Sequence, residues 1–239
     1  MTRVGIRKKK SGVLNWRIFP ICFLLAIYSC SYHNRLDGYV YYRVGTSPTT
    51  LDPALIVDVT GSTIAAKLFN GLVRLDKDLN IIPDIAESWR ISRDGLSYTF
   101  KLNHNVKFNN KQIVTSYDFK YSFKRILDPK TRSPNTWVLE KIKGAKDYLQ
   151  GKTDDVKGLK IIDEHTLEIR LVRPFSPFLY LLTMSAAYVV PEEEVKRWGP
   201  DFSSHPVGTG PFVLKEWLSD RELRLERQES YFGKKPQIQ

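Results

Sequence analysis

The sequence predicts a mixed α/β protein of the α+β kind, because strand-like and helix-like patterns both occur along it. Residues 97–102 alternate, with Tyr98, Phe100 and Leu102 on one face, which is the period of a half-buried strand. Across residues 119–127, apolar side chains recur instead at the spacing of a helix. Both periods within one short stretch favour strands packed against helices.

Two short elements are predicted before this strand. Residues 40–44 are expected to form a strand, and residues 62–69 a short helix. The asparagine–glycine pair at 70–71 suits the C-terminal cap of that helix, since both residues tolerate the left-handed conformation. The aspartate–glycine pair at 94–95 predicts a tight turn into the next strand, because glycine takes positive φ without steric cost.

The helix that follows has recognisable signals at both ends. Thr115 is followed three positions later by Asp118, the spacing of a capping box, so the helix is expected to begin there. Its end is expected at Asp128, because Pro129 disfavours helical geometry in the preceding residue.

The C-terminal half continues in the same mixed style. A hairpin is predicted from two strand-like runs in which Leu167 and Ile169 share one face. The predicted elements are the hairpin strands 159–162 and 166–171, a buried helical turn at 178–182, a helix at 192–198, and closing strands at 212–217 and 223–227. The glycines of Gly208-Thr209-Gly210 are interpreted as a tight turn into a strand, because Pro211 follows them.

Residues 1–29 have the composition of a targeting segment. Six basic residues lie there and no acidic one, and the apolar run at 18–28 is shorter than the roughly 20 residues that a membrane span needs. The run ends in Ile27-Tyr28-Ser29-Cys30, which resembles a bacterial lipobox and predicts lipidation of Cys30. An ordinary cleaved signal peptide and an uncleaved anchor remain alternatives. Cleavage before Cys30 would leave one cysteine and no intrachain disulfide.

Charge and motifs exclude several classes of function. The net charge of +11 falls to +5 beyond residue 29, where 31 basic residues face 26 acidic ones, so no nucleic-acid partner is expected. The four histidines are scattered and lack the spacing of a zinc site, and neither a nucleophile elbow nor a phosphate-binding loop occurs. We therefore expect no catalytic residue, no metal site and no cofactor.

A series of short segments resembles the motifs of one family, in the family's order. They are 50–53 (TLDP), 69–72 (FNGL), 83–89 (PDIAESW), 106–108 (VKF), 114–119 (VTSYDF), 206–212 (PVGTGPF) and 231–236 (YFGKKP). The sequence is similar to the extracytoplasmic solute-binding proteins of ABC importers, family 5, which bind dipeptides and oligopeptides. The loops at 103–105 and 109–111 depart from the family pattern without affecting a fold element.

The resemblance implies a periplasmic-binding-protein-like fold of type II, with a first lobe and an accessory domain. It implies a signal peptide at 1–29, the start of lobe I at 30–60, an accessory subdomain at 61–157 and more of lobe I at 158–239. Family members are much longer, and the 231–236 segment lies in mid-chain in them. The sequence is therefore expected to be a truncated form that stops before lobe II.

The resemblance also implies a function, partners and ligand contacts. We expect a lipid-anchored, extracytoplasmic and monomeric receptor that captures peptides, or another small solute, and delivers them to an ABC permease in the membrane. Its ligand contacts are expected at Val57, Asp58, Val59 and Asn135. Asn135 stands where peptide binders often carry an aromatic residue. The alternatives are a secreted lipoprotein without a transport role, a non-functional fragment and, third, an exported hydrolase.

Overall fold

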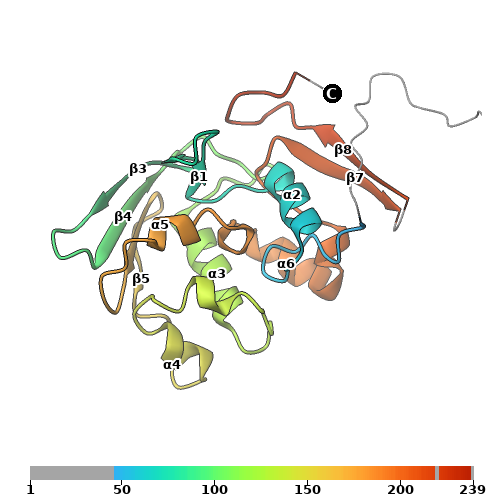
Figure 1. Cartoon of the computed structure of the whole chain (residues 1–239). Coiled ribbons are helices and arrows are strands. Elements are labelled where there is room, and N and C mark those ends of the chain that lie inside the picture. The colour runs from blue at the N-terminus through green and yellow to red at the C-terminus, as the bar shows by residue number, and fades with distance from the viewer. Residues whose placement is uncertain (1–45, 219–220, 238–239) are drawn as a thin grey trace, which may run out of the picture. The chain divides into compact units, whose positions relative to one another are not determined.

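The largest sheet of the computed structural model has four antiparallel strands, and it confirms the predicted α/β class (Figure 1). Its strands, in spatial order, are β3 (Ala86–Ile91), β4 (Ser97–Leu102), β6 (Thr166–Arg170) and β5 (Leu159–Asp163). The structure describes residues 46–218 and 221–237. The predicted strand at 40–44, the targeting segment and Cys30 lie outside these residues.

The alternation seen in the sequence decides which face of this sheet is buried. Tyr98, Phe100 and Leu102 are at most 3% exposed, and Phe100 pairs with Leu167 across the β4–β6 ladder. Burying this stripe removes apolar surface from water and is the main driving force for the packing. The strand and the hairpin predicted from alternation are confirmed.

Helix α3 (Ser116–Leu127) packs near this sheet, in contact with β5. The predicted capping box is present, since the Asp118 carboxylate accepts a 2.8 Å hydrogen bond from the Thr115 backbone N–H. Phe119 and Phe123 are fully buried and lie edge to face, with ring centroids 6.0 Å apart. The helix ends at its cap Asp128, as the following proline predicts.

Helix α2 (Val59–Leu68) begins three residues before the predicted start, because Asp58 caps it. Its C-cap is Phe69 in an extended conformation, and neither Asn70 nor Gly71 takes positive φ, so the predicted cap pair is wrong. A hairpin of β1 (Val73–Leu75) and β2 (Ile81–Pro83) follows, and the sequence patterns did not predict it. Each of its strands has three residues, too few for an alternating pattern to be recognised.

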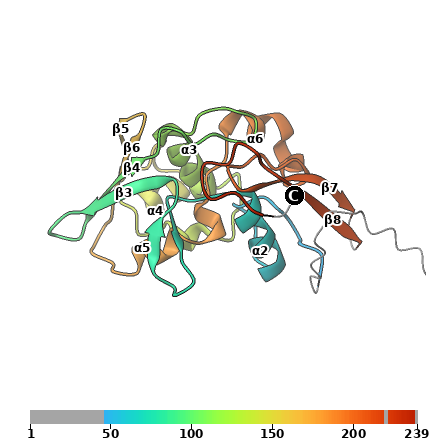
Figure 2. The ribbon, with the colours of Figure 1, turned by 90° about the horizontal axis from the view of Figure 1, so that it is seen from above.

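The hairpin of β7 (Phe212–Leu218) and β8 (Glu222–Arg227) confirms the predicted closing strands and contacts α2 through β7 (Figure 2). Short helical segments complete the described chain: η1 (Thr136–Val138), α4 (Ala145–Leu149), α5 (Phe178–Leu181), η2 (Ser185–Ala187), α6 (Glu192–Trp198) and η3 (Gly199–Ser204). Among them, the predicted helical turn at 178–182 and helix at 192–198 are confirmed.

The glycine-rich turn before β7 packs directly on the end of α2. A Cβ atom on Gly208 would lie 2.1 Å from the Leu68 carbonyl oxygen, and one on Gly210 would lie 2.4 Å from the Lys67 carbonyl oxygen. The Gly210 backbone N–H donates a 2.9 Å hydrogen bond to the Leu68 carbonyl. The segment is therefore a close-packed turn into a strand.

The four-stranded sheet joins residues from both sides of the predicted boundary at 157/158. Strands β3 and β4 come from the predicted accessory region, and β5 and β6 from the predicted continuation of lobe I. The described residues cluster as one unit by their contacts. The division into a lobe and an accessory subdomain stays a prediction.

Candidate functional site

The predicted ligand contacts lie on and beside the strap, which we define as residues 49–59. An ion pair fixes its first half, because the Asp52 carboxylate accepts hydrogen bonds from both terminal nitrogens of Arg125, one of them 2.7 Å long. The side chains of Asp52 and Arg125 are only 4% and 13% exposed. Burial alone would lower the pKa of Arg125, but the hydrogen bonds and charge of Asp52 outweigh it and raise that pKa.

Two further side chains fix the middle of the strap through its carbonyl groups. The Asn135 amide nitrogen donates a 2.8 Å hydrogen bond to the Ile56 carbonyl oxygen, and the Ser133 hydroxyl donates one of 2.5 Å to the Ala54 carbonyl oxygen. Asn135 is 8% exposed. The Asn135 amide is therefore directed at the backbone of the strap, and its contact with a ligand stays a prediction.

Asp58 lies near the end of the strap and is the N-cap of α2. Its carboxylate accepts hydrogen bonds from the Gly61 backbone N–H at 2.6 Å and from the Thr49 hydroxyl at 2.7 Å. Burial would raise the pKa of Asp58, but the hydrogen bonds from Thr49 and Gly61 outweigh it and lower that pKa. The Asp58 carboxylate therefore fixes the backbone where the strap meets α2.

Two valines of the strap remain exposed to solvent. Val57 is 68% exposed and Val59 83% exposed, whereas Leu51 and Ile56 beside them are buried. Large apolar side chains held outward on a fixed backbone suit contact with a ligand, because little order has to be created on binding. Trp137, two residues beyond Asn135, is a further exposed apolar side chain at 46%.

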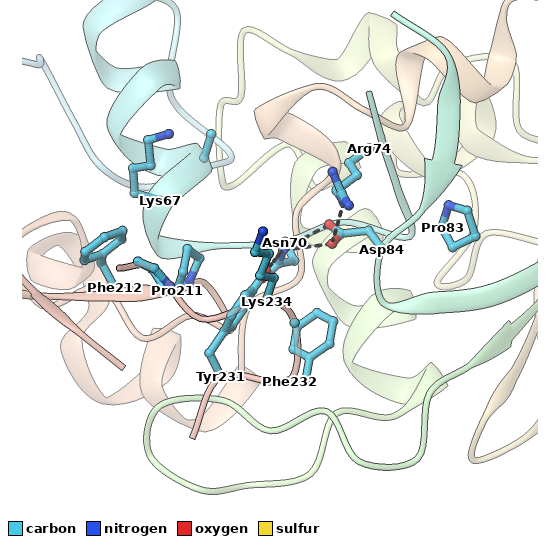
Figure 3. A pocket seen from close by; sticks show the side chains of 13 residues that line it. Lys67, Asn70, Arg74, Pro83, Asp84, Pro211, Phe212, Tyr231, Phe232 and Lys234 are labelled. Atoms are coloured by element: carbon cyan, nitrogen blue, oxygen red, sulfur yellow. Dashed lines mark hydrogen bonds and ion pairs between the residues drawn. The ribbon is translucent and has the colours of Figure 1, made fainter. Parts of the chain in front are cut away.

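A pocket of about 570 Å³ lies at the other end of α2 and was not predicted from the sequence (Figure 3). Its lining comes from α2, the β1–β2 hairpin, the turn before β7 and the segment after β8. Lys67, Arg74 and Lys234 bring positive charge to it, and Asp84 is its one acidic residue.

Asn70 joins four segments beneath this pocket. Its amide nitrogen donates to the two Asp84 carboxylate oxygens at 2.9 and 3.1 Å and to the Tyr231 hydroxyl at 3.3 Å (Figure 3). Its amide oxygen accepts a 3.1 Å hydrogen bond from the Thr209 hydroxyl. The Gly71 backbone N–H adds a third bond to Asp84, at 3.1 Å.

The environment of Asp84 is unfavourable for its charge. Its side chain is 4% exposed, and burial raises the pKa of Asp84 to about 6 although the hydrogen bonds of Asn70 and Gly71 and the charge of Arg74 lower it. Burial, reinforced by the charge of Asp84, raises the pKa of Tyr188 to about 12. Asn70 and Asp84 lie within two of the family-like motifs, and that is the one signal by which the sequence could have pointed to them.

The histidines do not form a metal site in the described part of the chain. The rings of His104 and His165 stack with centroids 3.9 Å apart, on loops that are distant in sequence. No group of three or more histidine, cysteine, aspartate or glutamate residues lies close enough to hold a metal ion among the described residues. Within those same residues, no helix is both long and apolar enough to cross a membrane.

Comparison with known proteins identifies the family. Residues 80–239 match the family described as "Bacterial extracellular solute-binding proteins, family 5 Middle". The chain belongs to this family, as the motifs indicated.

Two relatives show how much of a family member is present. The chain is 34% identical over 200 residues to the dipeptide-binding protein DppE of Bacillus subtilis, covering 82% of this chain and 36% of that protein. It is 35% identical over 194 residues to the periplasmic oligopeptide-binding protein OppA of Escherichia coli, covering 79% of this chain and 36% of that protein. The chain therefore spans little more than a third of the length of these relatives.

Solved structures share the fold. The substrate-binding domain of an oligopeptide ABC transporter from Bacillus anthracis superposes with a TM-score of 0.77 and 33% identity, over 80% of this chain and 38% of that one. OppA of Burkholderia pseudomallei gives a TM-score of 0.75 and 32% identity, over 79% and 38% of the two chains. The fold is that of periplasmic solute-binding proteins, and the coverage is consistent with an N-terminal portion.

Proposed function

We propose that this chain is part of a receptor that captures peptides outside the cytoplasmic membrane for an ABC importer, with the strap as one wall of its ligand site. The observation that carries the proposal is the fixed strap, which holds Val57 and Val59 outward at 68% and 83% exposure. The family's solute-binding role and the peptide-binding names of the relatives support it. We propose in addition that the receptor delivers the peptide to a permease.

The strap alone offers a ligand little burial. Drug-sized ligands in proteins commonly have 70–90% or more of their surface buried, which in a two-lobed receptor needs both walls. A single wall leaves the other side of a peptide in water, so we expect the strap by itself to hold peptides weakly.

Nuclear magnetic resonance of the ¹⁵N-labelled chain tests this use of the strap. On titration with trialanine, we expect saturable shifts of the Val57 and Val59 amides and no comparable shifts on β7 and β8. Val57→Asp together with Val59→Asp should abolish them. Val172→Asp is the matched control, since Val172 is 66% exposed on a different part of the chain. Trialanine shifts that survive the double substitution would exclude the strap as a ligand wall.

The transport role and the lipid anchor need separate tests in cells. Loss of the gene should lower the uptake of a labelled dipeptide, and normal uptake would favour a secreted protein without a transport role. Intact-mass measurement of the membrane fraction should find acyl chains on Cys30, which lies outside the described residues. Two acyl chains are expected, because one gives only marginal anchoring. Unchanged membrane attachment of Cys30→Ala would refute the anchor.

A further inference from the structure

The pocket at the C-terminal end of α2 carries more positive than negative charge. Lys67 comes from the last turn of α2, Arg74 from β1 and Lys234 from the segment after β8 (Figure 3). Lys67 and Lys234 are exposed, and the Arg74 side chain is 55% exposed. Cations from three separate segments thus line one pocket.

Asp84 offsets only part of this positive charge, because three cations face one carboxylate. Its carboxylate is 4% exposed and receives hydrogen bonds from Asn70 and the Gly71 backbone, and the nearest Arg74 nitrogen lies 3.8 Å away. Because burial raises the pKa of Asp84 to about 6, mild acid neutralises it and leaves the cations in excess. Arg74, Tyr188 and Tyr231 are the other titratable groups around it.

The size and walls of the pocket suit a small molecule. Its volume of about 570 Å³ lies within the range of roughly 300–1,000 Å³ typical of ligand sites. Phe212, Tyr231 and Phe232 give it aromatic surface, and Pro83 and Pro211 add rigid apolar surface. The lining is therefore about equally polar and apolar, so an organic ion could meet charged groups and aromatic surface in the same pocket.

We infer that this pocket binds a small molecule carrying a carboxylate or phosphate group, with the anion paired to Lys67, Arg74 and Lys234 and the rest of the molecule against Tyr231 and Phe212. This site is separate from the strap. The two lie at opposite ends of α2, a helix of 10 residues that is about 15 Å long. The inference therefore stands independently of the peptide-binding proposal.

Titration of the ¹⁵N-labelled chain with two anionic probes tests the inference. Inorganic phosphate represents the phosphate group and benzoate the carboxylate, and benzamide is the neutral counterpart of benzoate. We expect saturable shifts of the Asn70, Gly71 and Gly233 amides with at least one anion and none with benzamide. Tighter phosphate binding would identify a phosphorylated ligand, and tighter benzoate binding a carboxylate. Linear shifts with both anions, or equal shifts with benzamide, would overturn the inference.

Charge variants make the test specific to the pocket. Lys67→Ala combined with Lys234→Ala should weaken anion binding about tenfold, because two exposed ion pairs of modest strength are lost together. Lys77→Ala is the matched control, since Lys77 is an 86% exposed lysine at the tip of the β1–β2 hairpin and should leave the affinity unchanged. An unchanged affinity in the double variant would refute the site.

The pH dependence supplies an independent measurement. Binding should tighten about threefold from pH 7 to pH 5 as Asp84 takes up a proton and its repulsion of the anion disappears. For phosphate, the comparison is made against the Lys67→Ala, Lys234→Ala variant at each pH, because the charge of the probe also changes. Benzoate stays mostly ionised across this range, so a benzoate affinity that does not rise toward pH 5 would contradict the role of Asp84.

Discussion

The buried carboxylates near the two ends of helix α2 differ in their hydrogen-bond partners. At the N-terminal end, Asp52 in the strap is 4% exposed and is held by two nitrogens of Arg125. At the C-terminal end, Asp84 is equally buried, but its short hydrogen bonds come from the uncharged amides of Asn70 and Gly71. Equally buried carboxylates are therefore held by a charged partner at one end of α2 and by neutral donors at the other.

The difference lies in the distance and exposure of the neighbouring arginine. Arg125 is 13% exposed and reaches Asp52 within hydrogen-bond distance, whereas Arg74 is 55% exposed and stays 3.8 Å from Asp84. Neutral donors recover part of the hydration that a carboxylate loses, but a charged partner is needed to recover most of it. The ion pair thus fixes the backbone of the strap. At the pocket, the charge of Asp84 depends on the pH.

Removing the carboxylate of Asp52 should cause the largest change in the free energy of unfolding. Asp52→Ala leaves Arg125 buried without its partner, so we expect the free energy of unfolding to fall by about 3–5 kcal/mol. Urea denaturation monitored by tryptophan fluorescence measures it. Asp78→Ala is the control, because Asp78 pairs with Lys77 on the surface at 62% and 86% exposure and should change stability by less than about 1 kcal/mol.

A second variant separates the pair itself from the cost of breaking it. Asp52→Ala combined with Arg125→Met removes both charges, and it should recover part of the stability lost in the single variant. If Asp52→Ala loses less than about 1 kcal/mol, the pair does not fix the strap, and the contrast with Asp84 fails.

The next largest effect should be a pH dependence of the free energy of unfolding that is caused by the titration of Asp84. Its pKa rises from 3.8 to about 6 on folding, so the folded state binds the proton more tightly than the unfolded state does. The resulting stabilisation is fully present below pH 3.8 and is lost as the pH rises through 6. Two pH units correspond to at most about 3 kcal/mol.

Comparison with Asp84→Asn isolates this contribution. Subtracting the unfolding free energy of Asp84→Asn from that of the unaltered chain, at each pH from 4 to 7.5, cancels the groups that titrate alike in both. The difference should fall by about 2–3 kcal/mol across this range. A difference that stays constant with pH would show that Asp84 is ionised as easily in the folded chain as in the unfolded one.

Much of the fold could be predicted because its signals are local. The alternation at Tyr98, Phe100 and Leu102 and the capping pair of Thr115 and Asp118 each lie within a few residues, and the structure confirms both. The β1–β2 hairpin was missed because its strands are three residues long. Its turn is held by polar bonds of Asp76 to Asp78 and Asn80, which leave no apolar pattern.

The predicted ligand contacts came from the family resemblance, and none of them lies within the motifs themselves. The resemblance named Asn135 as one of these contacts, and the structure joins it to Ile56 across 79 positions of sequence. No local pattern predicted that the Asn135 amide would donate its hydrogen bond to the backbone of the strap. The raised pKa of Asp84 follows from burial among segments as distant as Tyr231, and burial of this kind becomes visible only in three dimensions.

The smallest expected effect concerns the surface carboxylate that caps α2. Asp58→Ala removes the acceptor for the Gly61 N–H and the Thr49 hydroxyl, and the loss of an N-cap typically costs about 1 kcal/mol. Asp58→Asn is the control, since asparagine caps helices as well as aspartate does.

Because the pKa of Asp58 is lowered on folding, its charge stabilises the chain above pH 3.8, and this contribution is lost as the pH falls below that value. The sign is opposite to that of Asp84, so urea denaturation at pH 3 and pH 6 should show Asp58→Asn and Asp84→Asn shifting in opposite directions relative to the unaltered chain. The same direction in both variants would mean that the two ends of α2 do not differ in how they hold their carboxylates.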